Sequence, residues 1–242
     1  MRHMMEPRIS IGTAAVNHHS QGHTHGPSAP APVGDTGAPP DLAPLPDMLA
    51  RLGARRSAPL RGLVGPGPTP DELDAMLALA VRVPDHGRLV PWRFIVVAGE
   101  ARRTLGERLD ALYARQNPEL PAAKADMWTL YLSRAPVTVV LVSRPDRAAK
   151  VPEWNQVLSA GAAGMALTVA ASALGFATQW LLKWPGRDAE AAALLGVGPQ
   201  EKVAGFIHIG RPARVNEDRP RPALDTVVSV WSPDQSISND TP

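Results

Sequence analysis

Between Glu153 and Lys183 the chain carries no charged residue, so this stretch cannot form an amphipathic element at the surface of a protein. A membrane span needs about 20 apolar residues, and the stretch is long enough for one. Polar side chains interrupt it, however, and Gly175 breaks it. We therefore predict that residues 154–174 form a helix buried on all sides within a soluble domain, with Gly175 in the position of a C-terminal cap.

The middle of this predicted helix consists of small residues. Residues 159–164 read SAGAAG, and side chains of this size let another backbone approach closely. A helix that is apolar all round needs neighbours on every side, and a second subunit could supply some of them. Alternatively, other elements of the same chain cover it completely. The sequence leaves both arrangements open.

Apolar periodicity predicts further elements around this helix. A first helix begins near Pro46, and a second begins at Thr69, Pro70 and Glu72, which form a capping box with proline at the first helical position. Pro84 ends that helix. Strands are predicted at 92–98, 136–143, 176–182 and 203–210, helices at 100–116 and 187–195, and a last extended piece at 226–231. Helices and strands do not alternate strictly, so the predicted class is α+β with a mainly antiparallel sheet.

The two ends of the chain differ in composition from this core. Residues 1–45 are rich in proline, glycine and histidine and poor in large apolar residues, so they cannot bury enough surface to offset their ordering entropy. We predict a disordered tail at 1–45, a folded domain at 46–231 and a flexible C-terminal tail at 232–242. Five of the seven histidines lie in the first tail, where adventitious metal binding is the alternative to simple solvation.

The sequence lacks the signatures of several kinds of chemistry. It has no cysteine, which excludes disulfides, thiolate metal sites and a cysteine nucleophile. It has no P-loop, no GxGxxG dinucleotide motif and no GxSxG nucleophile elbow. Outside the tail only His86 and His208 occur, without metal-ligand spacing, so we expect no folded metal site. His208 lies within a predicted strand, where we expect it to be packed or at a sheet edge.

Net charge and targeting signals limit the partners and the location. The formal net charge is +2, which gives no electrostatic reason to expect nucleic acid or an anionic membrane as a partner. The N-terminal residues contain no apolar run long enough for the core of a signal peptide. The expected location is therefore cytoplasmic.

Polar and aromatic residues gather where predicted elements end. The turn PDHGRLVPW at 84–92 holds more such groups than a simple connection between a helix and a strand needs. The groups of interest are Arg55, Arg56 and Ser57 after one helix, Arg82 and His86 after another, and Trp180 with Lys183 after a strand. This distribution is more typical of an anionic cofactor held by loops than of a compact catalytic triad.

Five segments also occur together in a familiar order. They are RRS at 55–57, RVPDHGRLVPWRFIVVAGE at 82–100, KVPEWNQVLSAGAAGMAL at 150–167, GFATQW at 175–180 and VAGFIHIGRP at 203–212. Together they resemble the nitroreductase family of FMN-dependent flavoproteins, and in particular its small bacterial NAD(P)H nitroreductase subgroup. The resemblance covers residues 46–231.

The resemblance implies a nitroreductase-like fold, in which helices flank the sheet and the long central helix lies at the interface of a homodimer. It implies that two FMN molecules bind at that interface and that the chain ends wrap onto the partner. The matching FMN-binding positions are Arg55, Arg56 and Ser57, then Arg82 and His86 reaching from the other subunit, and Trp180, Leu181 and Leu182. The segment that matches an NAD(P) contact comprises Ala170, Ala171, Ser172, Ala173, Leu174 and Gly175. No catalytic side chain and no metal are implied.

The chain departs from the family pattern after Trp180. The subgroup usually has a small or basic polar residue there, whereas this chain has Leu181 and Leu182, which offer only backbone groups and apolar contact. Arginine suits the phosphate of FMN because it forms bidentate, charge-assisted hydrogen bonds. The later basic residues that could serve the phosphate are Lys183, Arg187, Arg211, Arg214, Arg219 and Arg221, and the sequence does not choose among them.

The function implied by the resemblance is an oxidoreductase with FMN and NAD(P)H as cofactors. Hydride would pass from NAD(P)H to the flavin and then to a small-molecule acceptor such as a nitroaromatic or a quinone, by a ping-pong mechanism. In such enzymes the cofactor supplies the chemistry and the protein supplies binding and orientation. The alternatives are a flavin carrier or sensor without turnover, an interaction protein that has lost the cofactor, and a dehydrogenase or flavin-cleaving enzyme.

Overall fold

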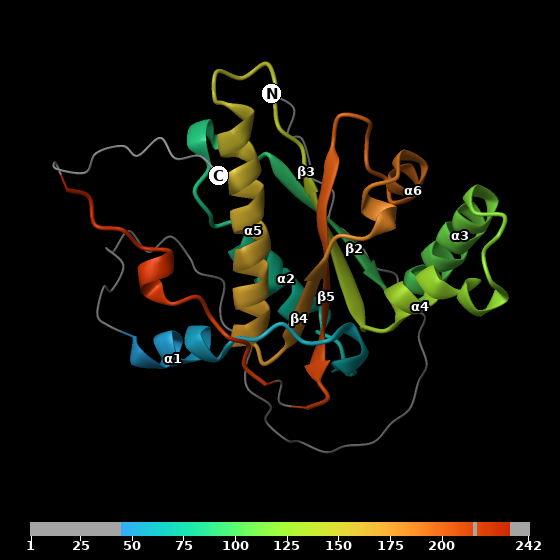
Figure 1. The fold of residues 1–242 in the computed structure, drawn as a ribbon, viewed down its shortest axis with the longest axis horizontal. Helices are drawn as coiled ribbons and strands as arrows, with labels where there is room; N and C mark the ends of the chain where they lie inside the picture. The colour runs from blue at the N-terminus through green and yellow to red at the C-terminus, as the bar shows by residue number, and fades with distance from the viewer. Residues whose placement is uncertain (1–44, 215–216, 233–242) are drawn as a thin grey trace, which may run out of the picture. The chain divides into compact units, whose positions relative to one another are not determined.

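The apolar runs of the chain pair into one antiparallel sheet (Figure 1). The computed structural model describes residues 45–214 and 217–232. Its strands are β1 (Leu63–Val64), β2 (Trp92–Ala98), β3 (Val137–Ser143), β4 (Ala177–Leu181) and β5 (Lys202–Pro212). Its α-helices are α1 (Pro46–Ala54), α2 (Pro70–Ala80), α3 (Ala101–Gln116), α4 (Met127–Ser133), α5 (Glu153–Ala173) and α6 (Ala189–Leu194). Single 3-10 turns are η1 (Leu60–Gly62), η2 (His86–Arg88), η3 (Ala122–Lys124), η4 (Trp184–Gly186) and η5 (Leu224–Thr226).

The central strand of the sheet is β5. It pairs with β3 along one edge and with β4 along the other, and its last residues pair with β1. β2 pairs with the outer edge of β3 in unbroken register, from Trp92 opposite Ser143 to Ala98 opposite Val137. Every residue of β3 is buried, as expected for an apolar strand with covered faces. All strand pairs are antiparallel, so the predicted α+β class is confirmed.

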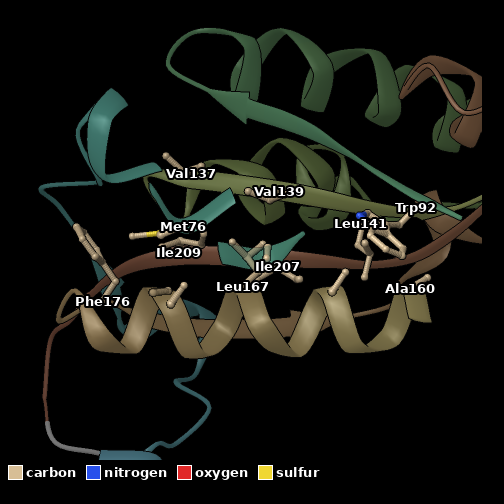
Figure 2. Packing of buried hydrophobic residues seen from close by; sticks show 14 residues of the cluster. Met76, Trp92, Val137, Val139, Leu141, Ala160, Leu167, Phe176, Ile207 and Ile209 are labelled. Atoms are coloured by element: carbon tan, nitrogen blue, oxygen red, sulfur yellow. The ribbon is translucent and has the colours of Figure 1, made fainter. Parts of the chain in front are cut away.

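Helices cover both faces of the sheet. One face packs against α2 and α5, and its core includes Met76, Leu167 and Ile207 (Figure 2). The opposite face packs against α3, α4 and α6, where the core includes Leu109 and Phe206. The alternation of side chains along each strand explains this division, because successive residues point to opposite faces.

α5 lies unusually close to the sheet at Gly164. A Cβ atom at this position would overlap Cη2 of Trp180 and lie 2.8 Å from Cδ2 of Leu141. The indole of Trp180 fills the space between α5 and β5, and its Nε1 donates to the carbonyl of Ala204 at 3.2 Å. Gly205 gives the same indole room from the side of β5, because a Cβ there would overlap its Nε1. The small residues of α5 thus serve a contact within the chain.

The prediction that the long helix is buried on all sides is wrong for the single chain. The face of α5 that packs on the sheet is buried, but on the opposite face Trp154 is 67 % exposed, Leu158 54 % and Met165 44 %. The reason is that the sheet and α2 cover only one side of a helix that is apolar all round. Among the described residues α5 is long and apolar enough to cross a membrane, but half of its apolar window is buried, and core helices of soluble proteins meet the same criteria.

Several local predictions are confirmed, and some elements were missed. Thr69 and Glu72 form the expected capping box at the start of α2, and Gly175 follows α5 with φ +79°. The short helix α4 was not predicted, although Trp128, Tyr131 and Leu132 show helical spacing. Residues 226–231 do not join the sheet. The tails predicted at 1–45 and 232–242 lie, except for Leu45 and Ser232, outside the described residues.

His208 is the most deeply buried titratable group of the sheet. It lies on β5 with no exposed surface, its Nδ1 is 2.8 Å from Oγ1 of Thr138, and its ring packs edge-on against Tyr131 at 4.7 Å. The prediction of a packed position is confirmed, and the edge-strand alternative is wrong because β5 is central. Burial lowers the pKa of His208 to about 4 and raises the pKa of the Tyr131 hydroxyl.

We expect the Gly164→Ala variant to lower the free energy of unfolding by about 1–3 kcal/mol, because the added methyl group overpacks the Trp180 contact. Urea unfolding monitored by circular dichroism would measure the change. The matched control is Gly53→Ala in α1, where nothing lies within 4 Å of the added carbon and the free energy of unfolding should not fall. Equal stability of the two variants would contradict the proposed packing.

His208 should make the protein less stable in acid. A histidine with a lowered pKa in the folded state binds its proton preferentially in the unfolded state, so its contribution is complete above about pH 6.5 and is lost as the pH falls towards 4. We expect the free energy of unfolding to fall by about 2 kcal/mol between about pH 7.5 and about pH 5 from this residue alone. Urea unfolding at both pH values should show a clearly smaller fall for His208→Gln.

Candidate cofactor-binding site

The RRS segment lies along the free edge of β4. It follows the end of α1, where Arg55 already has extended backbone geometry. Ser57 forms a parallel bridge with Thr178, and the amide of Ala58 donates to the carbonyl of Thr178 at 3.0 Å. The sheet therefore fixes the backbone of this segment and leaves the arginine side chains beside the start of β4.

A cavity of about 430 Å³, which we call the arginine cavity, opens at this point. The end of α1, the last turns of α5 and the start of β4 form its walls. The polar residues that line it are Arg55, Arg56 and Arg214 together with Thr168, Ser172 and Thr178. Three arginines and three hydroxyl-bearing residues around one cavity are suited to an anionic ligand with further polar oxygens.

The two arginines of the motif differ in their bonding. Arg56 donates to the carbonyl of Gly53 at 2.5 Å and forms an ion pair with Asp218 at 2.5 Å, so its guanidinium is already engaged. The side chain of Arg55 has no hydrogen bond or ion pair with another described residue, although Arg55 is half-buried. A guanidinium cannot lose its charge in a protein. A partly desolvated cation without an anion favours the binding of a negatively charged group at Arg55.

Of the later basic residues, only Arg214 lines this cavity. Arg211 donates to the carbonyl of Leu174 at 3.0 Å, lies 3.7 Å above the Phe176 ring and pairs with Glu72, so it holds the end of α5 to α2. Arg221 pairs with Asp218, which also accepts a bond from the backbone amide of Arg219. Lys183 and Arg187 follow the opposite end of β4, where Arg187 lines a different cavity.

Arg82 and His86 lie near the other end of α5. His86 Nδ1 is 3.5 Å from Nδ2 of Asn155, and the hydroxyl of Ser159 donates to the carbonyl of Pro84. Ser159 and Ser172 are separated along α5 by about 20 Å at 1.5 Å per residue. One chain therefore does not bring the two predicted groups of FMN-binding residues together.

The 180–182 segment points in three directions. Trp180 packs under α5, Leu181 joins the core on the opposite face of the sheet, and Leu182 is exposed. These positions follow from the alternation of a strand that ends at Leu181. The indole of Trp180 is mainly a packing group, and the assignment of the segment to FMN stays a prediction.

The 170–175 segment is only partly available to a ligand. The side chains of Ala170 and Ala171 are buried against the core, because helical periodicity turns them towards the sheet. The carbonyl of Leu174 is bonded to Arg211. Ser172 lines the arginine cavity, and Ala173 and Gly175 are exposed. For all six residues of the segment the NAD(P) assignment stays a prediction.

Sequence reasoning missed part of the cavity wall. Thr168 precedes Ser172 by one helical turn, Phe176 directly precedes β4, and Thr178 is the second residue of β4. The spacing of Thr168 and Ser172 predicts a shared helix face and could have shown the first of these. Among the described residues there is no group of three or more histidine, aspartate or glutamate side chains that could hold a metal ion.

Comparisons with known sequences show which proteins this chain is similar to. The profile of the Nitroreductase family matches residues 53–211. An Escherichia coli (strain K12) protein named "Putative NAD(P)H nitroreductase YdjA" is 34% identical over 167 residues, which cover 69% of this chain and 88% of that protein.

Solved structures share the fold. The nitroreductase-like family protein from Bacillus cereus superposes with a TM-score of 0.67 at 17% identity, covering 76% of this chain and 95% of that one. A nitroreductase with bound FMN from Bacteroides fragilis superposes with a TM-score of 0.59 at 22% identity, covering 77% and 99%. The matched segment contains Arg55, the turn after α2, the whole of α5 and β4. By sequence and by fold, this chain belongs to the nitroreductase family.

Proposed function

We propose that this protein is an FMN-dependent oxidoreductase that takes hydride from NAD(P)H and reduces a nitroaromatic, a quinone or a similar small acceptor. The observation that carries the proposal is Arg55, a half-buried residue whose side chain pairs with no other described residue, at a cavity that Arg214 and three hydroxyl-bearing residues also line. The Escherichia coli relative is named as an NAD(P)H nitroreductase, and the Bacteroides fragilis structure contains FMN. Both support the choice of cofactors.

The donor set of the cavity fits the phosphate and ribityl groups of FMN. Arg55 and Arg214 would bind the phosphate, because charge-assisted hydrogen bonds from arginine suit a phosphate group. Ser172 and Thr178 offer hydroxyl groups that can both donate and accept. Arg56 would act mainly by holding the end of α1 and Asp218 in place.

The distribution of these residues supports a homodimer. The arginine cavity lies near the end of α5, whereas Arg82 and His86 lie near its start, about 20 Å away along the helix. Between them α5 exposes an apolar face that includes Leu158 and Met165. If a second copy packed antiparallel on this face, the end of α5 in one subunit would lie beside the start of α5 in the other. Each site would then receive the arginine cavity from one subunit and Arg82 and His86 from its partner.

Bound FMN would supply the hydride chemistry of the reaction. The residues of this chain would bind and orient it, and no side chain is required as a general acid or base. Because donor and acceptor would use the same site in turn, ping-pong kinetics are expected. The cytoplasmic location and the lack of nucleic-acid and membrane partners stay predictions.

We expect the purified protein to carry a flavin absorption spectrum that bleaches under anaerobic NADH or NADPH and recovers with a nitroaromatic or a quinone. Arg55→Gln should raise the Kd for FMN by about 10- to 100-fold, because charge-assisted hydrogen bonds to the phosphate are lost. The matched control, Arg61→Gln, changes an exposed arginine outside the cavity and should keep the full flavin content.

Results that differ from these expected spectra would have distinct meanings. A flavin that stays oxidised with both nucleotides would point to a carrier or a sensor. A protein that takes up no FMN would contradict the proposal. An Arg55→Gln variant with a normal flavin content would contradict the role of Arg55 as an FMN-binding residue, but it would not contradict the proposed enzymatic function.

Leu158→Glu should disrupt the proposed dimer. The substitution places a charge in the exposed apolar face of α5, where an unpaired carboxylate could not be buried without a large cost. We expect light scattering after gel filtration to show half the mass of the wild type, together with loss of FMN. Leu130→Glu, which changes an exposed leucine on α4, is the control and should keep both. A dimeric, flavin-loaded Leu158→Glu variant would contradict this arrangement.

A further inference from the structure

The turn between α2 and β2 has an uncommon backbone conformation. φ is +77° at Gly87, +52° at Arg88 and +48° at Val90. Glycine adopts such values freely. For a β-branched residue like Val90 the left-handed region is a genuine outlier, because Cβ comes too close to the backbone. This turn therefore stores strain at Val90 and, to a smaller degree, at Arg88.

The carboxylate of Asp85 holds the strained backbone in place. Its Oδ1 accepts the amide of Leu89 at 3.1 Å, and its Oδ2 accepts the amide of Val90 at 2.9 Å. On the other side of the same residue, Nε of Arg144 donates to the carbonyl of Val90 at 3.3 Å. Val90 is thus held through both its amide and its carbonyl.

The turn is also fixed to its neighbours. The hydroxyl of Ser159 on α5 donates to the carbonyl of Pro84. Gly87 packs against the loop before α5, since a Cβ there would lie 3.3 Å from Cγ2 of Val151. A connection between a helix and a strand needs none of these restraints, and strain of this kind persists only where the surroundings impose it, most often at functional sites.

The restraints leave η2, residues 86–88, exposed. No ion pair joins Arg88 or the nearby Arg82 to another residue of the described part of the chain, and both are exposed. Among the described residues, the one hydrogen-bond partner of the His86 imidazole is the side-chain amide of Asn155, at 3.5 Å. The turn therefore presents a basic tip whose hydrogen-bonding groups are almost unused.

We propose that Asp85 is a positioning residue, which clamps the amides of Leu89 and Val90 and thereby presents His86 and Arg88 to the FMN bound mainly by a second copy of the chain. This inference rests on the proposed function. Arg88 becomes an additional cofactor-binding residue beside His86, and Asp85 acts through both without touching the cofactor. The geometry that carries the inference is the pair of carboxylate bonds across a strained valine.

The test combines loss of the clamp with relief of the strain. Asp85→Ala should raise the Kd for FMN about tenfold, because two hydrogen bonds to a carboxylate are lost and the turn relaxes. Adding Val90→Gly should bring the Kd back to within about threefold of the wild type, because glycine adopts the positive φ without the clamp. Dilution of the flavin-loaded protein, followed by the fluorescence of released FMN, would measure each Kd.

The matched control is Asp74→Ala, which removes the same charge from an exposed position on α2. The carboxylate of Asp74 forms no hydrogen bond or ion pair with the described residues, so this variant should leave the Kd for FMN unchanged. Circular dichroism would confirm that every variant is folded. If Asp85→Ala does not fold, Asp85→Asn replaces it. The asparagine side chain keeps one acceptor oxygen, so the loss of affinity should be smaller and should again be reversed by Val90→Gly.

The outcomes separate this inference from the proposed function. A wild-type protein that binds no FMN would contradict the function itself. A wild type that binds FMN, with an Asp85→Ala variant of equal Kd, would contradict only the positioning role. A weakened variant that Val90→Gly does not rescue would also contradict it, because Asp85 would then act as a charge or as a general stabiliser and not through the shape of the turn.

Discussion

The contact between Gly164 and Trp180 sets the distance between α5 and the sheet, and the rest of the site depends on that distance. The indole occupies the place that a Cβ would need, both on α5 and at Gly205 of β5. With the helix this close, its last turns reach the start of β4 and form a wall of the arginine cavity with Thr168 and Ser172. Its first turns reach the strained turn through Ser159. The close contact at Gly164 thus places the end of α5 at the cavity and its start at the turn before β2.

Electrostatics distinguishes structural arginines from those available to a ligand. Arg56 and Arg211 are bonded to carbonyls and to acids, and they hold Asp218 and the end of α5. Arg55 and Arg214 line the cavity without such partners among the described residues. All four are the same residue type, so only the bonding in the folded chain separates their roles. A positive charge left unpaired at a cavity wall is stabilised most when an anion binds there.

Much of the fold could be predicted from the sequence because its signals are local. The capping box at Thr69 and the apolar run 92–98 each fix one element, and both appear where they were predicted. The partial burial of α5 could not be predicted, since composition shows that a helix is apolar but not which neighbours cover it. The bond between Arg56 and Asp218 joins residues far apart in the sequence. Likewise, the letters PDHGRLV mark a special turn, but the positive φ at Val90 follows from three-dimensional restraints.

The separation of the two binding groups along α5 has a genetic consequence for the proposed dimer. Each polypeptide would own the arginine half of one site and the turn half of the other. A chain damaged at Arg55 and a chain damaged at Asp85 would then form a mixed dimer in which both lesions fall in the same site and the second site is intact. Two alleles that are each defective in FMN binding would complement each other within one molecule, and one of the two sites of the mixed dimer would bind FMN normally.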